Sequence, residues 1–290
     1  MVLNKEFRSI KMPKYTRQIV VFIDILGFSS MLPAFEREAL ENDAIGEEGY
    51  HESGTLNKLV EIFNGAVKLI KRANCKAYQF SDNLCITINY INNDTESPDL
   101  LVEMLKLVSM LMFEFVKEGY FLRGGIDAGW FLDADDIAVG VPLVVAYRLE
   151  SEQAVYPRAL LSERFIGILD EYSRSRMLSD TGAFLAEYYI ANDGKLRYLN
   201  PFFYITNFED KEGKIDYLRT YSVIIKEKLQ QFKGDTRIEP KYSWLANEFN
   251  QFIDKYVTGQ AYLELDDDQL DYTDSEIKFI QSLKISLHGV

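Results

Sequence analysis

Two aspartates in this sequence stand in surroundings that leave a charged side chain in need of a partner. Asp24 lies within residues 20–28, a run of Val, Ile, Phe and Leu. Asp82 lies between two strand-like runs, residues 75–80 and 84–88. Burying an unpaired carboxylate among such side chains costs on the order of several kcal/mol, so both acids require a partner. Hard divalent cations are the usual partners of convergent carboxylates, and the pair therefore predicts a metal site.

The pattern of the first half of the chain predicts the elements that would position these two acids. Val- and Ile-rich runs predict strands, and apolar residues at helical spacing predict helices. Pro98 and Gly119 mark the two ends of the longest predicted helix. In chain order we expect a strand at residues 17–28, a helix at 56–72, strands at 76–80 and 84–90, a helix at 98–118 and a strand at 120–130.

This order of elements is that of the split βαβ, ferredoxin-like arrangement (βαββαβ), so the predicted fold class is α+β. In that arrangement the end of the first strand lies beside the turn of the central hairpin. Asp24 and Asp82 can therefore converge although 58 positions separate them. A two-cation site built in this way can bind both the attacking and the leaving oxygen of a phosphoryl transfer.

The rest of the chain has a weaker pattern. A helix that begins at Pro142 and a strand and helix within residues 158–169 continue the first region. Beyond about residue 172, short aromatic and helix-like stretches alternate without a clear repeat. We expect residues 1–170 to form the core and residues 171–290 a C-terminal α/β extension, either as a separate unit or as part of the same domain.

Composition narrows the possible partners. The chain has 290 residues, of which 47% are hydrophobic and 27% charged, as in ordinary globular proteins. A formal net charge of −13 argues against nucleic acid and anionic membranes as partners, because both require clustered Lys and Arg. The longest apolar helix candidate, residues 100–121, is interrupted by charged residues and is not expected to span a membrane. With only Cys75 and Cys85 and no apolar leader, we expect a cytoplasmic protein with reduced thiols.

Four motifs, in this order, resemble those of the class III nucleotidyl cyclases. Residues 22–28 resemble the family's first metal motif, Phe-x-Asp-Ile-x-Gly-Phe. Residues 80–82 resemble its Gly-Asp hairpin turn, with Ser in place of Gly. Residues 123–129 resemble its Arg-x-Gly-x-x-x-Gly strand, and residues 140–150 its Gly-x-x-x-Asn-x-Ala-x-Arg helix. The resemblance spans roughly residues 17–170 and implies the ferredoxin-like cyclase core.

The resemblance implies a site for two Mg²⁺ or Mn²⁺ ions on a nucleoside triphosphate. Asp24, Asp82 and the Ile25 carbonyl would hold the ions. The family forms homodimers with the sites at the subunit interface, so Arg148 of the partner subunit would stabilise charge on the α-phosphoryl group. Arg123, at the start of a strand, is expected to form a structural ion pair rather than to contact the substrate.

Three positions that contact the nucleoside in the family differ here. Tyr78 stands where adenylate cyclases have a base-reading Lys, and Ile137 stands where they have an Asp, with Asp136 beside it. Val144 replaces the Asn that positions the ribose. We expect these three replacements, together with Phe28, to contact the substrate. The sequence thus keeps the metal-binding residues of the family and changes the residues that read the base. In this combination it is similar to the bacterial pyrimidine cyclases of Pycsar antiphage defence.

That likeness implies conversion of UTP or CTP to 3′,5′-cyclic UMP or cyclic CMP and pyrophosphate. The product would be a second messenger for a separate effector protein. A Tyr hydroxyl can pair with the exocyclic group of either pyrimidine, so the sequence favours uracil over cytosine only slightly. Two alternatives stay open: an adenylate or guanylate cyclase, and a catalytically silent cyclase-like domain that senses a ligand.

Overall fold

A computed structural model describes residues 14–41, 53–92, 95–134, 137–257 and 272–287 of the chain. Its centre is a mixed sheet with the strand order β2-β3-β1-β6-β8-β10-β9, and β7 pairs with the C-terminal end of β6. The strands of this sheet are β1 (Tyr15–Ile25), β2 (Lys76–Phe80), β3 (Asn83–Asn89), β6 (Leu122–Ala134), β7 (Ile137–Gly140), β8 (Ala159–Leu161), β9 (Ile190–Asn192) and β10 (Arg197–Leu199). A separate pair is formed by β4 (Ile91–Asn92) and β5 (Thr95–Glu96).

The four strands β2, β3, β1 and β6 follow the ferredoxin-like order. β1 pairs antiparallel with β3 on one side and with β6 on the other, and β2 forms a hairpin with β3. Helix α2 (Gly54–Arg72) leads from β1 to β2, and helix α3 (Asp99–Lys117) leads from β3 to β6. This order confirms the predicted α+β class and the predicted βαββαβ arrangement.

The two faces of the sheet are covered differently. Alternate residues of β1, such as Val21, lie in the main core with α2 and α3. The residues between them, such as Val20, point to the opposite face and form a smaller cluster with Phe131. Helix α4 (Val141–Arg148) covers part of this second face, where Tyr147 contacts Phe22 edge-on at 5.5 Å between ring centroids.

Two adjacent glycines allow close approaches to β6, Gly125 by α4 and Gly124 by the neighbouring strand β1. A Cβ at Gly125 would lie 2.2 Å from the carbonyl oxygen of Ala146, and a Cβ at Gly124 would lie 2.5 Å from that of Phe22. No side chain fits at either place. The chain leaves α4 through a π-helical turn, Leu149–Gln153. Turns of this type are rare and occur frequently at functional sites.

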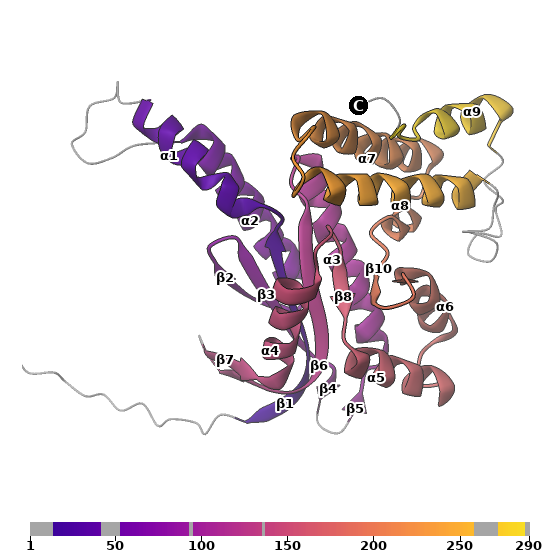
Figure 1. The fold of residues 1–290 in the computed structure, drawn as a ribbon. Helices are drawn as coiled ribbons and strands as arrows, with labels where there is room; N and C mark the ends of the chain where they lie inside the picture. Colours follow the sequence, from indigo (N-terminus) through magenta and orange to yellow (C-terminus); the bar gives the residue numbers. More distant parts are fainter. Residues whose placement is uncertain (1–13, 42–52, 93–94, 135–136, 258–271, 288–290) are drawn as a thin grey trace, which may run out of the picture.

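Beyond residue 170 the chain extends the sheet and adds a second core. β10 pairs with both β8 and β9, so strands from both predicted regions share one sheet. The helices α7 (Lys211–Gln231), α8 (Glu239–Val257) and α9 (Asp274–Ser282) form a second hydrophobic cluster, which includes Leu26 and Phe121 from the first region. Figure 1 shows α7 and α8 beside the upper end of the sheet, with α2 on its other side. The remaining helices are α1 (Leu32–Glu41), α5 (Glu163–Arg174), α6 (Asp180–Tyr189) and two short ones, η1 (Phe28–Ser30) and η3 (Phe203–Asn207).

The sequence analysis also predicts reduced thiols and no membrane-spanning helix in residues 100–121. Cys75 and Cys85 are both buried and not joined in a disulfide. In the part of the chain that the structure describes, no helix has the length and the apolar character needed to cross a bilayer.

Candidate active site

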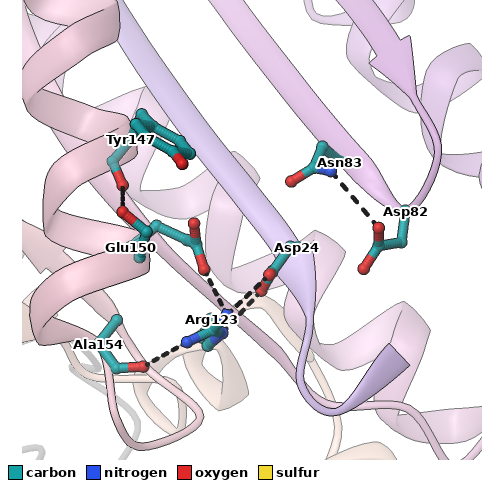
Figure 2. Close-up of polar contacts among 8 residues, drawn as sticks. Asp24, Asp82, Asn83, Arg123, Tyr147, Glu150 and Ala154 are labelled. Carbon is teal, nitrogen blue, oxygen red and sulfur yellow. Dashed lines mark hydrogen bonds and ion pairs between the residues drawn. The ribbon is translucent and has the colours of Figure 1, made fainter. Parts of the chain in front are cut away.

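Asp24 and Asp82 come together at one end of the sheet. Asp24 lies near the end of β1, just past its last pair with β3, and Asp82 lies in the turn between β2 and β3. The backbone amide of Ile25 partly offsets the raised pKa of Asp82, which places the Asp82 carboxylate near the residue that follows Asp24. Burial and the nearby charge of Asp24 raise the pKa of Asp82. Figure 2 shows the two carboxylates on neighbouring strand ends.

The turn that carries Asp82 has an unusual backbone. Ser81 adopts a φ of 55°, in the left-handed region that favours glycine. Glycine is the residue that the resemblance predicts at this position. The turn therefore keeps the conformation expected from a Gly-Asp motif although its first residue carries a side chain.

Arg123 binds Asp24 from the neighbouring strand. The two residues are Cα partners in the β1–β6 register. The Arg123 Nε and Nη2 atoms donate to the two oxygens of Asp24 at 3.0 Å each, and Nη1 donates to the Ala154 carbonyl at 3.4 Å. The structural ion pair expected for Arg123 is therefore present, and its partner is the predicted metal ligand.

Glu150 adds a third carboxylate to this end of the sheet. Its side chain is buried, and its Oε1 lies 2.7 Å from Nη2 of Arg123 (Figure 2). The alignment of this ion pair is not that of a hydrogen bond, and Oε1 accepts none from any described residue. Burial, with the charge of Asp24, raises the pKa of Glu150 to about 8, and Arg123 opposes this shift only in part.

The sequence analysis assigned no role to Glu150. A Glu that follows a helix with Arg at its end resembles a solvated charge. The π-helical turn at Leu149–Gln153 directs it inward, toward Arg123. The available signal was the pair of glycines at 124–125, which predicts a close approach of another element but not which one.

The donor set fits divalent cations that take further oxygens from elsewhere. Arg123 pairs with both Asp24 and Glu150, the charge of Asp82 also acts on it, and one buried carboxylate oxygen has no donor. Such an excess of acid favours a bound cation. Within the described ranges, however, no three acidic, His or Cys side chains lie close enough together to hold a metal ion. Asp24 and Asp82 would therefore need the Ile25 carbonyl and oxygens of the substrate or of water.

Tyr78, the predicted base-reading residue, is part of a polar cluster around Asp133. Its hydroxyl donates to Asp133 Oδ1 at 2.6 Å, and Thr87 donates to Oδ2 at 2.9 Å. Lys76 forms an ion pair with the same carboxylate. Burial alone would raise the pKa of Asp133, but the hydrogen bonds from Lys76 and Tyr78 lower it. Asp133 itself lies in the β6–β7 hairpin, where it is the Cα partner of Ala138.

The other predicted substrate residues lie outside this cluster. Phe28 begins η1 directly after Gly27, which has a φ of 80°, and its ring packs on Phe35 at 6.3 Å. Ile137 and Val144 are 58% and 50% exposed on β7 and α4. Asp136 lies outside the described residues.

Arg148 is also placed on the surface. Its side chain is exposed at the end of α4 and forms no hydrogen bond or ion pair with any described residue. The structure thus brings Asp24, Asp82 and Ile25 together. It places the predicted residues of β7 and α4 on an exposed part of the same chain.

Comparison with known proteins finds similar solved structures but no matching sequence. No family model matches the sequence, and no curated protein matches it either. Among solved structures, the adenylyl cyclase CyaB from P. aeruginosa is 16% identical, with a TM-score of 0.39 over 55% of this chain and 83% of its own. A guanylyl cyclase domain from the fungus Blastocladiella emersonii is 15% identical, with a TM-score of 0.40 over 55% of this chain and 87% of its own.

A third structure of this kind is the guanylate cyclase domain from Catenaria anguillulae in complex with GTP. It is 17% identical, with a TM-score of 0.38 over 54% of this chain and 83% of its own. All three neighbours are adenylyl or guanylyl cyclase domains. Likeness at this level supports no conclusion about the activity of this chain, which must be argued from its own residues.

Proposed function

We propose that this chain is a nucleotidyl cyclase that converts a nucleoside triphosphate to a 3′,5′-cyclic nucleotide and pyrophosphate. The observation that carries the proposal is the convergence of Asp24 and Asp82, one near the end of β1 and the other in the β2–β3 turn beside it (Figure 2). The four sequence motifs in register support the same reading.

Asp24, Asp82 and the Ile25 carbonyl would hold two Mg²⁺ or Mn²⁺ ions. When bound, such ions lower the pKa of the ribose 3′-hydroxyl and neutralise the departing pyrophosphate. Arg123 fixes the orientation of the Asp24 carboxylate through two hydrogen bonds at 3.0 Å. Its charge also offsets part of the repulsion among Asp24, Asp82 and Glu150. This pairing keeps the Asp24 carboxylate oriented in a partly buried place.

A homodimer would complete the site. The exposed large apolar side chains Ile137, Val139, Val141, Val144 and Tyr147 lie within two consecutive elements, β7 and α4. We call these five residues the β7–α4 surface. An exposed apolar patch of this kind is typical of a protein interface. Arg148 lies beside it without a described partner, so association through this surface could bring Arg148 of the partner subunit to the phosphates.

The base is proposed to be a pyrimidine, uracil before cytosine, and the product a messenger in Pycsar antiphage defence that a separate effector detects. The support is the replacement of the base-reading Lys by Tyr78 and of the ribose-binding Asn by Val144. Because the Tyr78 hydroxyl donates to Asp133, it would offer the base its acceptor lone pair, or exchange partners when the substrate binds.

A purine cyclase is the second candidate, and the Asp133 cluster favours it. Lys and Asp are the side chains that read adenine in adenylate cyclases. Here Lys76 and Asp133 form an ion pair beside Tyr78, two positions along the strand from the expected Lys. A Lys–Asp pair is therefore present, with its Lys on the same strand as Tyr78 but two positions earlier and its Asp on β6.

The test is a four-way turnover assay. Purified protein with Mn²⁺ is given ATP, GTP, CTP or UTP separately, and the products are resolved by mass spectrometry. We expect cyclic UMP or cyclic CMP from the wild type. Asp24→Asn and Asp82→Asn should yield no detectable product, whereas Asp216→Asn, at an exposed acid of α7, should leave turnover unchanged.

Each contrary outcome identifies what is wrong. Cyclic AMP or cyclic GMP alone would contradict the pyrimidine assignment and favour the second candidate. Full turnover in Asp24→Asn would contradict the two-metal site. No product from any of the four triphosphates would contradict the cyclase proposal and favour the silent sensor.

A further inference from the structure

Helix α8, from the C-terminal region, packs on the strand ends that carry the candidate site. Tyr242, in its first turns, contacts Phe121 edge-on at 5.3 Å between ring centroids. The carbonyl of Phe121 in turn accepts a hydrogen bond at 2.8 Å from the amide of Leu26, two residues after Asp24. Tyr242, Phe121 and Leu26 are all buried in the second hydrophobic cluster. The start of α8 is therefore held firmly against the end of β1.

The connection that leads into α8 is also well defined. Gly234 has a φ of 83°, and its amide donates to Glu239 at 2.6 Å. The carboxylate of Asp235 accepts from the amides of Arg237 and Ile238 at 2.8 and 3.1 Å. These contacts fix the direction in which α8 begins, and so the place of its first side chains.

Lys241 precedes Tyr242 and is a half-buried cation without a partner. Its ammonium group forms no hydrogen bond or ion pair with any residue that the structure describes. Burial and the nearby charges of Arg123 and Arg237 lower the pKa of Lys241, and the charges of Asp24 and Asp235 act in the opposite direction. The side chain is thus within electrostatic reach of the candidate site.

A partly desolvated cation without an anion is unfavourable, and an anionic ligand would relieve it. The acids near Lys241 are unsuited to this role, because Asp24 is bound by Arg123 and the Asp235 carboxylate accepts from the amides of Arg237 and Ile238. A phosphate group delivered to the end of β1 would supply the missing charge. Arg237, near Lys241, makes this edge of the site more positive.

We propose that Lys241, a residue of the C-terminal helices and not of the ferredoxin-like core, binds the polyphosphate group of the substrate. This inference rests on the proposed function for the identity of the ligand, a nucleoside triphosphate. It gives the C-terminal region a direct part in the site: α8 supplies a cation to the strand end where Asp24 and Asp82 meet. Lys241 acts in binding and orientation, and no proton or bond changes at it.

The test measures binding of inorganic tripolyphosphate, with Mg²⁺, to the full chain by titration calorimetry. Lys241→Met keeps the length of the side chain and removes its charge, and we expect it to bind about 10-fold more weakly than the wild type. Lys241→Arg should bind within about threefold of the wild type, since it restores the charge. The matched control is Lys233→Met, at an exposed lysine in the same connection, which should bind as the wild type does.

Thermal unfolding of the variants separates a binding defect from a folding defect, because Lys241→Met should melt at the wild-type temperature. Equal affinity of Lys241→Met and the wild type would overturn the inference, and so would a wild type that does not bind tripolyphosphate. Turnover decides the proposed function independently. If the wild type binds tripolyphosphate through Lys241 but cyclises no triphosphate, the phosphate site stands and the cyclase proposal fails.

Discussion

At the scale of single residues, Arg123 is the cation on which the arrangement of acids depends. Its side chain is 24% exposed and contacts both Asp24 and Glu150, which are 13% and 4% exposed. Removing one member of a largely buried ion pair leaves the other charge without compensation, at a cost of roughly 3–5 kcal/mol. We expect Arg123→Met to lower the free energy of unfolding by about 3 kcal/mol, measured by urea unfolding in the presence of a chelator.

The matched control for that prediction is Arg219→Met. Arg219 pairs with Asp216 on α7, where both side chains are more than half exposed. An exposed pair of this type contributes at most about 1 kcal/mol. If both variants lost the same small amount, Arg123 would not hold buried charges together, and the account of the site given above would be wrong.

Gly125 is a second residue whose effect on stability can be predicted. A methyl group there would overlap the Ala146 carbonyl and the Leu149 side chain, and so would displace the turn that carries Glu150. We expect Gly125→Ala to destabilise the protein by at least about 1–3 kcal/mol, the usual range for overpacking. Gly65→Ala, in α2 with nothing near its Cβ position, should stabilise by about 0.5–1 kcal/mol. Equal urea midpoints for the two variants would contradict the close approach of α4.

At the scale of elements, Arg158 joins the core to the C-terminal helices. Its guanidinium lies 4.6 Å from the ring centroid of Tyr198 on β10 and 5.1 Å from that of Trp244 on α8. Nη1 also donates to Asp193 at 2.7 Å. Aromatic faces and a carboxylate thus compensate a buried cation. Since α8 also carries Lys241, this contact fixes the helix that would bind phosphate.

The pH dependence of stability tests this junction. Burial alone would raise the pKa of Asp193, but hydrogen bonds from Leu196 and Arg158 lower it to about 2. A lowered pKa in the folded state gives stability that is present above the unfolded pKa, near 4, and is lost as the pH falls through 2. We expect Asp193→Asn to be less stable than the wild type by about 1–2 kcal/mol at neutral pH.

That difference between Asp193→Asn and the wild type should shrink steadily below about pH 4, as the carboxylate is protonated in the unfolded state while it stays charged in the folded state down to about pH 2. Urea midpoints measured at several pH values would show it. A difference that stayed constant down to about pH 2 would mean that the charge of Asp193 is not what stabilises the junction.

The sequence was a good guide to elements whose residues alternate or repeat regularly. β1, α2, the β2–β3 hairpin and α3 were predicted with the right type and order, because one face of each packs on the main core. The β6–β7 hairpin was missed, since its acidic residues resemble a loop until Lys76, Tyr78 and Thr87 are seen to bind Asp133. Helix α7 was not delimited from the sequence, because its first turns are mostly polar.

The residues of the candidate site also divide into those that a sequence pattern reveals and those that only tertiary contacts reveal. Asp24 and Asp82 could be predicted because an acid in an apolar strand is conspicuous in a sequence. Glu150 and Lys241 could not, because each is an ordinary surface-like residue on its own element. Their importance comes from tertiary contacts: the π-helical turn points Glu150 inward, and the packing of Tyr242 on Phe121 brings Lys241 to the strand end.

At the scale of the whole molecule, the residues proposed to act on one substrate lie in two separate places on the chain. Asp24 and Asp82 lie at the end of the sheet, whereas Arg148 is exposed beside the β7–α4 surface without a described partner. If the sites form between subunits, Arg148→Ala alone should lower turnover by roughly 10³-fold, as for an arginine supplied in trans. Stability should not change, because this side chain makes no described contact.

Mixing two inactive variants then distinguishes a shared site from a site within one chain. An Asp24→Asn subunit retains Arg148, and an Arg148→Ala subunit retains Asp24, so a mixed dimer has one intact site of two. Random reassortment makes half of the dimers mixed, and turnover should return to roughly a quarter of the wild-type value. Adding Val141→Glu to both subunits should abolish this recovery, because it places a charge in the β7–α4 surface, whereas Val223→Glu on α7 should leave it intact. An inactive mixture of well-folded dimers would show that Arg148 acts within its own chain or not at all.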